Sequence, residues 1–177
     1  MKRLLITAAT IAAIAAPAYA ALKAGAKAPD FSANAALGGK PFAFSLNEAL
    51  KKGPVVLYFF PAAFTSGCTL EAHAFAEATP EFEKLGTTVI GVTAGNIDRI
   101  NEFSVSECRN KFAVAGDPDL KIAKSYDATL ALRPGWSDRT SYVIAPDHTI
   151  VFSYSKLDPS KHVELTMDAV KAWKAKH

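Results

Sequence analysis

The sequence is poor in cysteine: Cys68 and Cys108 are the only two among its 177 residues. They are 40 positions apart, so the chain contains no Cys-x-x-Cys dithiol motif. Two cysteines are also too few for a disulfide-rich scaffold, which excludes that class of small exported protein. Any cysteine chemistry therefore depends on one or both of these thiols, and the fold depends on an apolar core.

The chain also lacks a strong excess of charge. Its formal net charge is +3 at pH 7, and it falls to +1 without Lys2 and Arg3 near the N-terminus (3 − 2 = 1). A nearly neutral chain with no basic run offers little electrostatic attraction to nucleic acid, so no such partner is predicted. Aspartate and histidine occur without ligand spacing, and no metal or other cofactor is predicted.

Long apolar runs are absent except at the N-terminus. There, Lys2 and Arg3 precede the run "LLITAATIAAIAA", which is followed by an Ala-Tyr-Ala cleavage site ending at Ala20. This pattern predicts a secretory signal peptide over residues 1–20 and a mature domain over residues 21–177, with an uncleaved anchor as the alternative. We expect an exported protein, in a bacterial periplasm in the simplest case, with no stable membrane association after cleavage.

The remaining sequence alternates strand and helix patterns. The run "GPVVLYFF" at 53–60 is apolar, β-branched and aromatic, which predicts a strand buried on both faces. The order predicts an α/β domain with a central sheet flanked by helices and an N-terminal β-hairpin. Strands are expected around the Gly38-Gly39 turn and at 53–60, 87–93, 140–146 and 149–154, and helices at 66–85 (interrupted or kinked at Pro80), 96–112, 117–126 and after Asp158.

Cys68 follows the buried strand, in the first turn of the next predicted helix. The unpaired N–H groups and the dipole of a helix N-terminus favour an anion there, and the thiolate is the nucleophilic form of cysteine. Thr65 is placed for its hydroxyl to hydrogen-bond the sulfur, Gly67 permits close approach to the backbone, and Pro61 can seal one wall against water. Each residue alone has a simple structural explanation, but together they favour a reactive thiol.

The spacing Pro61-x-x-x-Thr65-x-x-Cys68 resembles the active-site signature of the peroxiredoxins, the alkyl hydroperoxide reductase/thiol-specific antioxidant superfamily. The tripeptide Gly-Cys-Thr around Cys68, followed by Glu-Ala, is similar to the bacterioferritin-comigratory, or Q-type, branch. The resemblance extends from "APDF" at 28–31 to the last helix, and Arg139 matches the arginine that begins a late strand in the family. It implies a thioredoxin-like fold and a peroxide-reducing enzyme.

The resemblance also implies a role for each residue of the site. Cys68 is expected to attack hydrogen peroxide or a small organic hydroperoxide and to become a sulfenic acid. Arg139 would stabilise the thiolate and the peroxide oxygens through donors that are always charged. Thr65 and the backbone N–H groups of Gly67 and Cys68 would hold the peroxide in line, while Pro61 would shield the site from water.

The resolving step departs from the family pattern. Many Q-type members place a second cysteine five residues after the first, where this chain carries His73, interpreted as an ordinary residue of the helix surface. Cys108, late in the predicted helix at 96–112, is the expected resolving cysteine, and a single-cysteine mechanism is the alternative. The reductant is expected to be a thiol, either a thioredoxin-like protein or a small molecule, and the enzyme a monomer or homodimer. Glu71 is interpreted as a favourable first-turn anion of its helix, with tuning of the nearby site as the alternative.

Two other functions compete with this interpretation. A thioredoxin-type thiol-disulfide oxidoreductase would need a second cysteine where the chain carries Thr65. A non-catalytic exported domain with a structural Cys68–Cys108 disulfide suits an oxidising compartment. That second alternative leaves unexplained why Pro61, Thr65 and Arg139 accompany Cys68.

Overall fold

The computed structural model describes residues 21–177, and the predicted signal peptide at 1–20 lies outside the described residues. A seven-stranded mixed sheet forms the centre of the domain, with the strand order β2-β1-β5-β4-β3-β6-β7. The strands are β1 (Ser32–Leu37), β2 (Lys40–Ser45), β3 (Val55–Phe59), β4 (Thr88–Thr93), β5 (Ala113–Gly116), β6 (Thr140–Ile144) and β7 (Ile150–Ser155).

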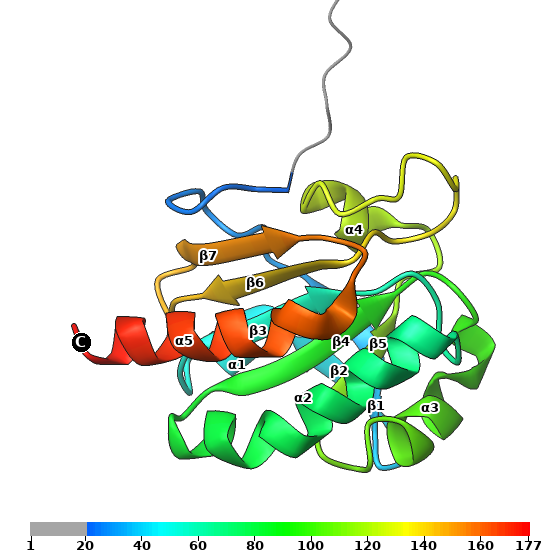
Figure 1. The fold of residues 1–177 in the computed structure, drawn as a ribbon, viewed down its shortest axis with the longest axis horizontal. Coiled ribbons are helices and arrows are strands. Elements are labelled where there is room, and N and C mark those ends of the chain that lie inside the picture. Colours follow the sequence, from blue (N-terminus) through cyan, green and yellow to red (C-terminus); the bar gives the residue numbers. More distant parts are fainter. Residues whose placement is uncertain (1–20) are drawn as a thin grey trace, which may run out of the picture.

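Helices cover both faces of the sheet (Figure 1). The helices α2, α3 and α5 pack on one face, and α1 and α4 pack on the other. Within residues 21–177, no helix is long and apolar enough to cross a membrane. The helical segments are α1 (Leu46–Leu50), α2 (Ser66–Lys84), η1 (Ile97–Arg99), α3 (Ile100–Ser106), α4 (Lys121–Ser125), η2 (Pro159–Lys161) and α5 (His162–Lys174).

The central strand β3 divides the core into two apolar clusters. All of its residues are fully buried, as the continuous apolar run predicts. Val56 and Tyr58 point into the cluster beneath α2, α3 and α5, whereas Val55, Leu57 and Phe59 point into the cluster beneath α1 and α4. This alternation follows from the two-residue period of a strand.

The strand directions confirm the predicted architecture. β3, β4 and β5 are parallel to one another, while β1 with β2 and β6 with β7 form antiparallel hairpins. In the first hairpin, Gly38 and Gly39 have φ values of 56° and 76°, the left-handed conformation that a tight two-residue hairpin turn requires. The N-terminal hairpin and the flanked central sheet are therefore both present.

Two elements are missing from the prediction. The strand β5 has the sequence "AVAG", in which only the valine favours a strand, and its pairing between β1 and β4 stabilises it. The helix α1 is only five residues long, and Ser45 caps it by accepting a hydrogen bond from the N–H of Glu48. Both elements depend on tertiary contacts that a local pattern does not contain.

Three predicted helices differ in detail. The helix α2 continues through Pro80 without division, because Phe75 and Phe82 on either side of the proline are anchored in one cluster. The predicted helix at 96–112 ends at Ser106, since Arg109 and Asn110 adopt left-handed φ angles of 50° and 59°.

The third difference concerns the segment from Asp117 to Tyr126. Asp117 does cap the helix α4, because its carboxylate accepts hydrogen bonds from the N–H groups of Ile122 and Ala123. The helix itself begins at Lys121, since Leu120 has a left-handed φ of 54°. The capping residue is therefore correct, but the predicted start at Pro118 is wrong.

Candidate active site

Cys68 is the third residue of α2, just after the loop that follows β3. The residue is 1% exposed, so its sulfur is covered by protein. The N–H groups of the first helical turn have no partner within the helix, and the positive end of the helix dipole lies at the same place. The backbone around Cys68 therefore favours a negatively charged group.

Arg139 lies beside Cys68 because of the way two strands pair. β6 runs antiparallel to β3, and Thr140 at its start pairs with Phe59 at the end of β3. The residue before β6 and the loop that leads to Cys68 therefore meet at one edge of the sheet. The Nη2 of Arg139 lies 3.5 Å from Cys68 Sγ, and the arginine is 4% exposed. The structure thus brings together two residues that are 71 positions apart.

Three groups hold the Arg139 guanidinium in place. Its Nε donates to the carbonyl of Leu157 at 2.7 Å, its Nη1 pairs with the carboxylate of Glu71, and its Nη2 faces Cys68. Burial opposes the charge of Arg139, but Glu71 and Cys68 together outweigh it and raise the pKa of the guanidinium. The arginine is therefore a fixed cation shared by a carboxyl group and a thiol.

Glu71 lies near the site, as the sequence suggested, but its preferred interpretation does not hold. It lies beyond the first turn of α2, is 0% exposed and pairs through Oε2 with Arg139, so the expected role as a first-turn anion is wrong. Burial raises the pKa of Glu71 to about 8, although Arg139 opposes the shift. Its spacing of three residues from Cys68 places both on one helix face, which was the available signal.

Gly67 allows the arginine to approach the helix closely. A Cβ atom at this position would lie 3.2 Å from Arg139 Nη2, tighter than nearly all contacts of this kind. From the sequence, Gly67 is expected to permit close approach to the backbone N–H groups beside the thiol. The structure adds a second reason for glycine, since a side chain here would push against the guanidinium that faces Cys68.

The hydroxyl of Thr65 makes a different contact from the one expected. Thr65 is the N-cap residue of α2, but its Oγ1 donates to the carbonyl of Ala62 at 3.0 Å and not to the sulfur of Cys68. A carbonyl oxygen is a stronger acceptor than sulfur, and it lies within reach three residues earlier. Because the hydroxyl proton is used there, the lone pairs of Thr65 Oγ1 can accept a hydrogen bond from a bound molecule.

Pro61 and the loop after it are anchored to the segment that follows β4. Pro61 is buried, and its carbonyl accepts a hydrogen bond from Thr93 Oγ1 at 3.1 Å. The amide of Asn96 donates to the carbonyl of Ala63 at 2.8 Å, and the N–H of Ala63 donates to the carbonyl of Gly95. The loop that delivers Cys68 to the helix is therefore fixed from a neighbouring strand.

Cys108 lies in the turn after α3, so the prediction that it lies late in a helix is wrong. The residue is 0% exposed, and burial and the neighbouring Glu107 raise the pKa of its thiol. Both cysteines are free in this structure, and both belong to the apolar cluster beneath α2. This structure therefore shows the reduced form of both thiols.

Two contacts between polar side chains join the Cys108 turn to α2, and we call them the Cys108 clamp. The Nε2 of His73 lies 2.9 Å from Glu107 Oε2, and Arg109 Nη1 lies 3.0 Å from Glu77 Oε1. Glu107 and Arg109 flank Cys108, while His73 and Glu77 are one turn apart on α2. His73 is therefore more than an ordinary residue of the helix surface, because it contacts the segment that carries the second thiol.

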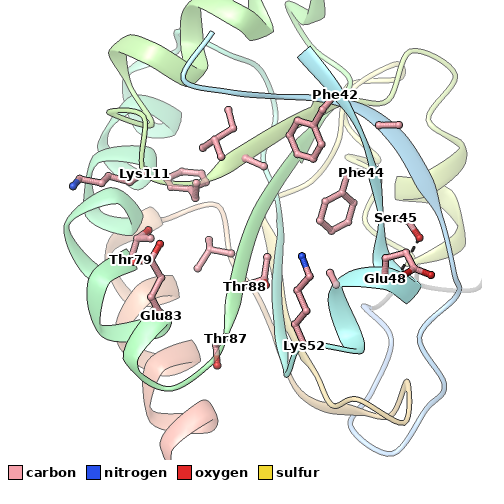
Figure 2. A pocket seen from close by; sticks show the side chains of 16 residues that line it. Phe42, Phe44, Ser45, Glu48, Lys52, Thr79, Glu83, Thr87, Thr88 and Lys111 are labelled. Carbon is pink, nitrogen blue, oxygen red and sulfur yellow. Dashed lines mark hydrogen bonds between the residues drawn. The ribbon is translucent and has the colours of Figure 1, made fainter. Parts of the chain in front are cut away.

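A cavity of about 480 Å³ lies at the other end of α2 (Figure 2). Phe44 and Lys52 point into it from β2 and from the chain after α1. Its contact with α2 begins at Thr79, 11 residues after Cys68, which corresponds to about 16 Å along the helix axis. The cavity therefore has no part in the site around Cys68.

A thioredoxin-like sheet that presents a helix N-terminal cysteine to a buried arginine defines a thiol-dependent oxidoreductase. Residues 24–153 match the AhpC/TSA family, and the chain belongs to this family of peroxiredoxins, the thiol peroxidases. Its relatives place it in the Q-type, or bacterioferritin-comigratory, branch.

Individual comparisons support this assignment. A putative peroxiredoxin bcp of Helicobacter pylori is 39% identical over 107 residues, which cover 60% of this chain and 67% of the relative. The chloroplastic peroxiredoxin Q of Sedum lineare is 28% identical over 137 residues, 77% of this chain and 72% of that protein. The crystal structure of peroxidoxin BcpB from Mycobacterium tuberculosis is similar at 25% identity with a TM-score of 0.76, covering 85% of this chain and 97% of the other.

Proposed function

We propose that this protein reduces hydrogen peroxide and small organic hydroperoxides through a sulfenic acid at Cys68. The observation that carries the proposal is the buried guanidinium of Arg139, 3.5 Å from the sulfur of a helix N-terminal cysteine. Fixed donors in a water-excluded site stabilise developing negative charge more strongly than water does. Membership of the peroxiredoxin family supports the same chemistry.

The proposed reaction is an in-line displacement. The Cys68 thiolate attacks the outer oxygen of the hydroperoxide, so that the S–O bond forms while the O–O bond breaks. The sulfur loses two electrons and becomes a sulfenic acid, and the departing hydroxide or alkoxide takes up a proton as water or alcohol. Arg139, Thr65 Oγ1 and the backbone N–H groups of Gly67 and Cys68 are the groups proposed to bind the two oxygens of the hydroperoxide.

The burial of Cys68 supports a preference for small substrates. The residue is only 1% exposed, and Pro61 beside it is also buried. A bulky hydroperoxide cannot reach a sulfur that is covered in this way without local opening of the loop. Hydrogen peroxide and short-chain hydroperoxides need the least opening and are therefore the proposed substrates.

Cys108 is the proposed resolving cysteine. It shares an apolar cluster with Cys68. A disulfide requires Cα atoms within about 7 Å, and we propose that opening of the first turn of α2 and of the Cys108 turn brings the two sulfurs together. The raised pKa of the Cys108 thiol makes it a slow nucleophile until that opening exposes it to water. Its thiol then condenses with the Cys68 sulfenic acid and releases water, and an external thiol reduces the disulfide.

The compartment restricts the reductant. The signal-peptide pattern at 1–20 supports export to a periplasm, where cytosolic thioredoxin does not act. A thioredoxin-like protein of that compartment or a small thiol is the proposed donor. The protein is proposed to act as a monomer or homodimer.

Removal of each thiol in turn tests the proposal. With a small external thiol as reductant, Cys68→Ser should consume hydrogen peroxide at least about a thousandfold more slowly than the parent protein. Cys108→Ser is the matched control, because it removes the other buried thiol and should retain rapid first turnover. Rapid peroxide consumption by Cys68→Ser would contradict the assignment of the nucleophile.

A further inference from the structure

The ionisable groups of the site extend beyond Arg139 to the helix α5. Glu71 pairs with Arg139 through Oε2, and its other oxygen, Oε1, lies 3.7 Å from Nδ1 of His162, the first residue of α5. Glu71 and His162 are both 0% exposed. Cys68, Arg139, Glu71 and His162 thus form one buried chain that joins α2, the residue before β6 and α5.

Two contacts orient the ring of His162. Its Nε2 lies 2.9 Å from the carbonyl of Lys156, and a carbonyl only accepts, so Nε2 carries a proton. Its Nδ1 lies 2.8 Å from Ser141 Oγ. Burial lowers the pKa of His162 to about 4, although the Lys156 carbonyl opposes the shift. At neutral pH the ring is therefore neutral, and Nδ1 is a hydrogen-bond acceptor that faces both Ser141 and Glu71.

The Oε1 atom of Glu71, which faces His162, has no hydrogen-bond partner of its own in the part of the chain that the structure describes. Among residues 21–177, no side chain or backbone group hydrogen-bonds this buried oxygen. The ionisable groups around Glu71 are Arg139 just before β6, His162 from α5, Cys68 from its own helix and Tyr58 from β3.

The charge balance of this buried cluster depends on Glu71. If Cys68 and Glu71 are both ionised, the single cation of Arg139 serves two anions in a water-poor interior. If Glu71 holds a proton, Arg139 and the Cys68 thiolate form a balanced pair. A low-dielectric environment disfavours the uncompensated charge, so it favours the second arrangement.

We propose that His162 is a positioning residue for the reaction at Cys68. Its Nδ1 accepts a hydrogen bond from a proton on Glu71 Oε1, which leaves the charge of Arg139 to the Cys68 thiolate. A shortening of about 1 Å brings Oε1 and Nδ1 to hydrogen-bond distance, with the Ser141 hydroxyl as a competing donor to the same lone pair. This inference rests on the proposed peroxidase function of Cys68.

Two substitutions separate this role from a structural one. In His162→Gln, the side-chain amide can still donate to the Lys156 carbonyl in place of Nε2, but the acceptor at the Nδ1 position is lost. His162→Asn keeps a polar group at the Nδ1 position and removes the Nε2 contact. The measurement is the rate constant for the reaction with hydrogen peroxide in a single turnover, from about pH 5 to about pH 9.

The expected result follows from the competition for Arg139. Without the Nδ1 acceptor, protonated Glu71 is less stable, so Glu71 ionises at lower pH and takes part of the arginine charge. The Cys68 thiolate then forms at higher pH, and the rate at pH 7 should fall about three- to tenfold in His162→Gln. His162→Asn should remain closer to wild type, with a smaller displacement of the pH profile.

A matched background tests the coupling to Glu71. Glu71→Gln cannot lose a proton in this range, so His162→Gln should displace the pH profile no further when it is added to that variant. If His162→Gln does not fold, Ser141→Ala replaces it, because it frees Nδ1 for Glu71 and should displace the profile to lower pH. An unmoved profile in the tested variant, or a larger loss in His162→Asn than in His162→Gln, overturns the proposal. Failure of the peroxidase function itself is distinguishable, because the wild-type protein would then show no reaction at Cys68.

Discussion

The two cysteines occupy the same apolar cluster but have different surroundings. Cys68 lies in the first turn of a helix and faces a buried guanidinium at 3.5 Å. Cys108 lies in a turn after a helix, beside Glu107, and burial raises the pKa of its thiol. Both are almost fully covered, with exposures of 1% and 0%. Burial therefore does not distinguish them, and the charge around each sulfur does.

The comparison shows how one core can hold two thiols with different tasks. A helix N-terminus and a cation supply stabilisation for a thiolate at one position, while an adjacent carboxylate disfavours it at the other. Under the proposed function, Cys68 reacts with the peroxide, and the thiol of Cys108, whose pKa burial raises, reacts only after its turn opens.

Loss of the Arg139 guanidinium should have the largest effect on the difference in reactivity between Cys68 and Cys108. Arg139→Gln should slow the reaction of Cys68 with hydrogen peroxide by about a hundredfold to a thousandfold, because the fixed donors beside the sulfur are lost. Arg139→Lys should lie between this variant and wild type, since a single ammonium cannot face both Cys68 and Glu71 as a guanidinium does. Stopped-flow rates at pH 7 measure both, with circular dichroism as the check of folding. A rate within about threefold of wild type in Arg139→Gln would show that the cation is dispensable.

Differential labelling should show a smaller but clear difference. In the folded, reduced protein at pH 7, iodoacetamide should modify Cys68 at least about tenfold faster than Cys108, because each unit of pKa increase removes about nine-tenths of the thiolate. Peptide mass spectrometry gives the two rates. In concentrated urea the rates should converge, and equal rates in the folded protein would remove the proposed distinction.

Weakening the Cys108 clamp should give the smallest effect. Glu77→Gln removes the ion pair with Arg109 and should speed formation of the Cys68–Cys108 disulfide about two- to fivefold, since partly exposed ion pairs contribute up to about 1 kcal/mol. The preceding reaction with peroxide should be unchanged. Acid-quenched samples analysed by mass spectrometry follow disulfide formation.

Glu102→Gln is the matched control for the clamp. Its carboxylate pairs with Arg99 within the same segment and makes no ion pair with α2. This substitution should leave the rate of disulfide formation unchanged. An equal increase in both variants would show that general loosening of α3, and not the clamp, is responsible.

Much of the site could be predicted because its signals are local. Pro61, Thr65, Gly67 and Cys68 lie within eight residues after a recognisable buried strand, so their proximity is a property of the sequence. Arg139 is different, since no local rule joins positions 71 residues apart. The family motif identified it, and the pairing of β6 with β3 is the physical reason that it reaches the site.

The remaining features depend on tertiary packing. Glu71 has the same spacing from Cys68 whether its helix face meets water or β6 and α5, so sequence alone does not reveal its burial. The Thr65 hydroxyl had two acceptors within reach, and the loop geometry selects the Ala62 carbonyl. Cys108 lies outside the helix because Arg109 and Asn110 adopt left-handed conformations, which neither residue requires.

The contrast between the two thiols is tested most directly by the intact mass after one equivalent of hydrogen peroxide. The wild-type protein should lose two hydrogen atoms as the Cys68–Cys108 disulfide forms, and Cys108→Ser should gain a single oxygen atom located on Cys68. If peroxide is consumed while Cys68 remains a reduced thiol, or if the oxygen appears on Cys108 in Cys68→Ser at the wild-type rate, the division of roles between the two cysteines is wrong.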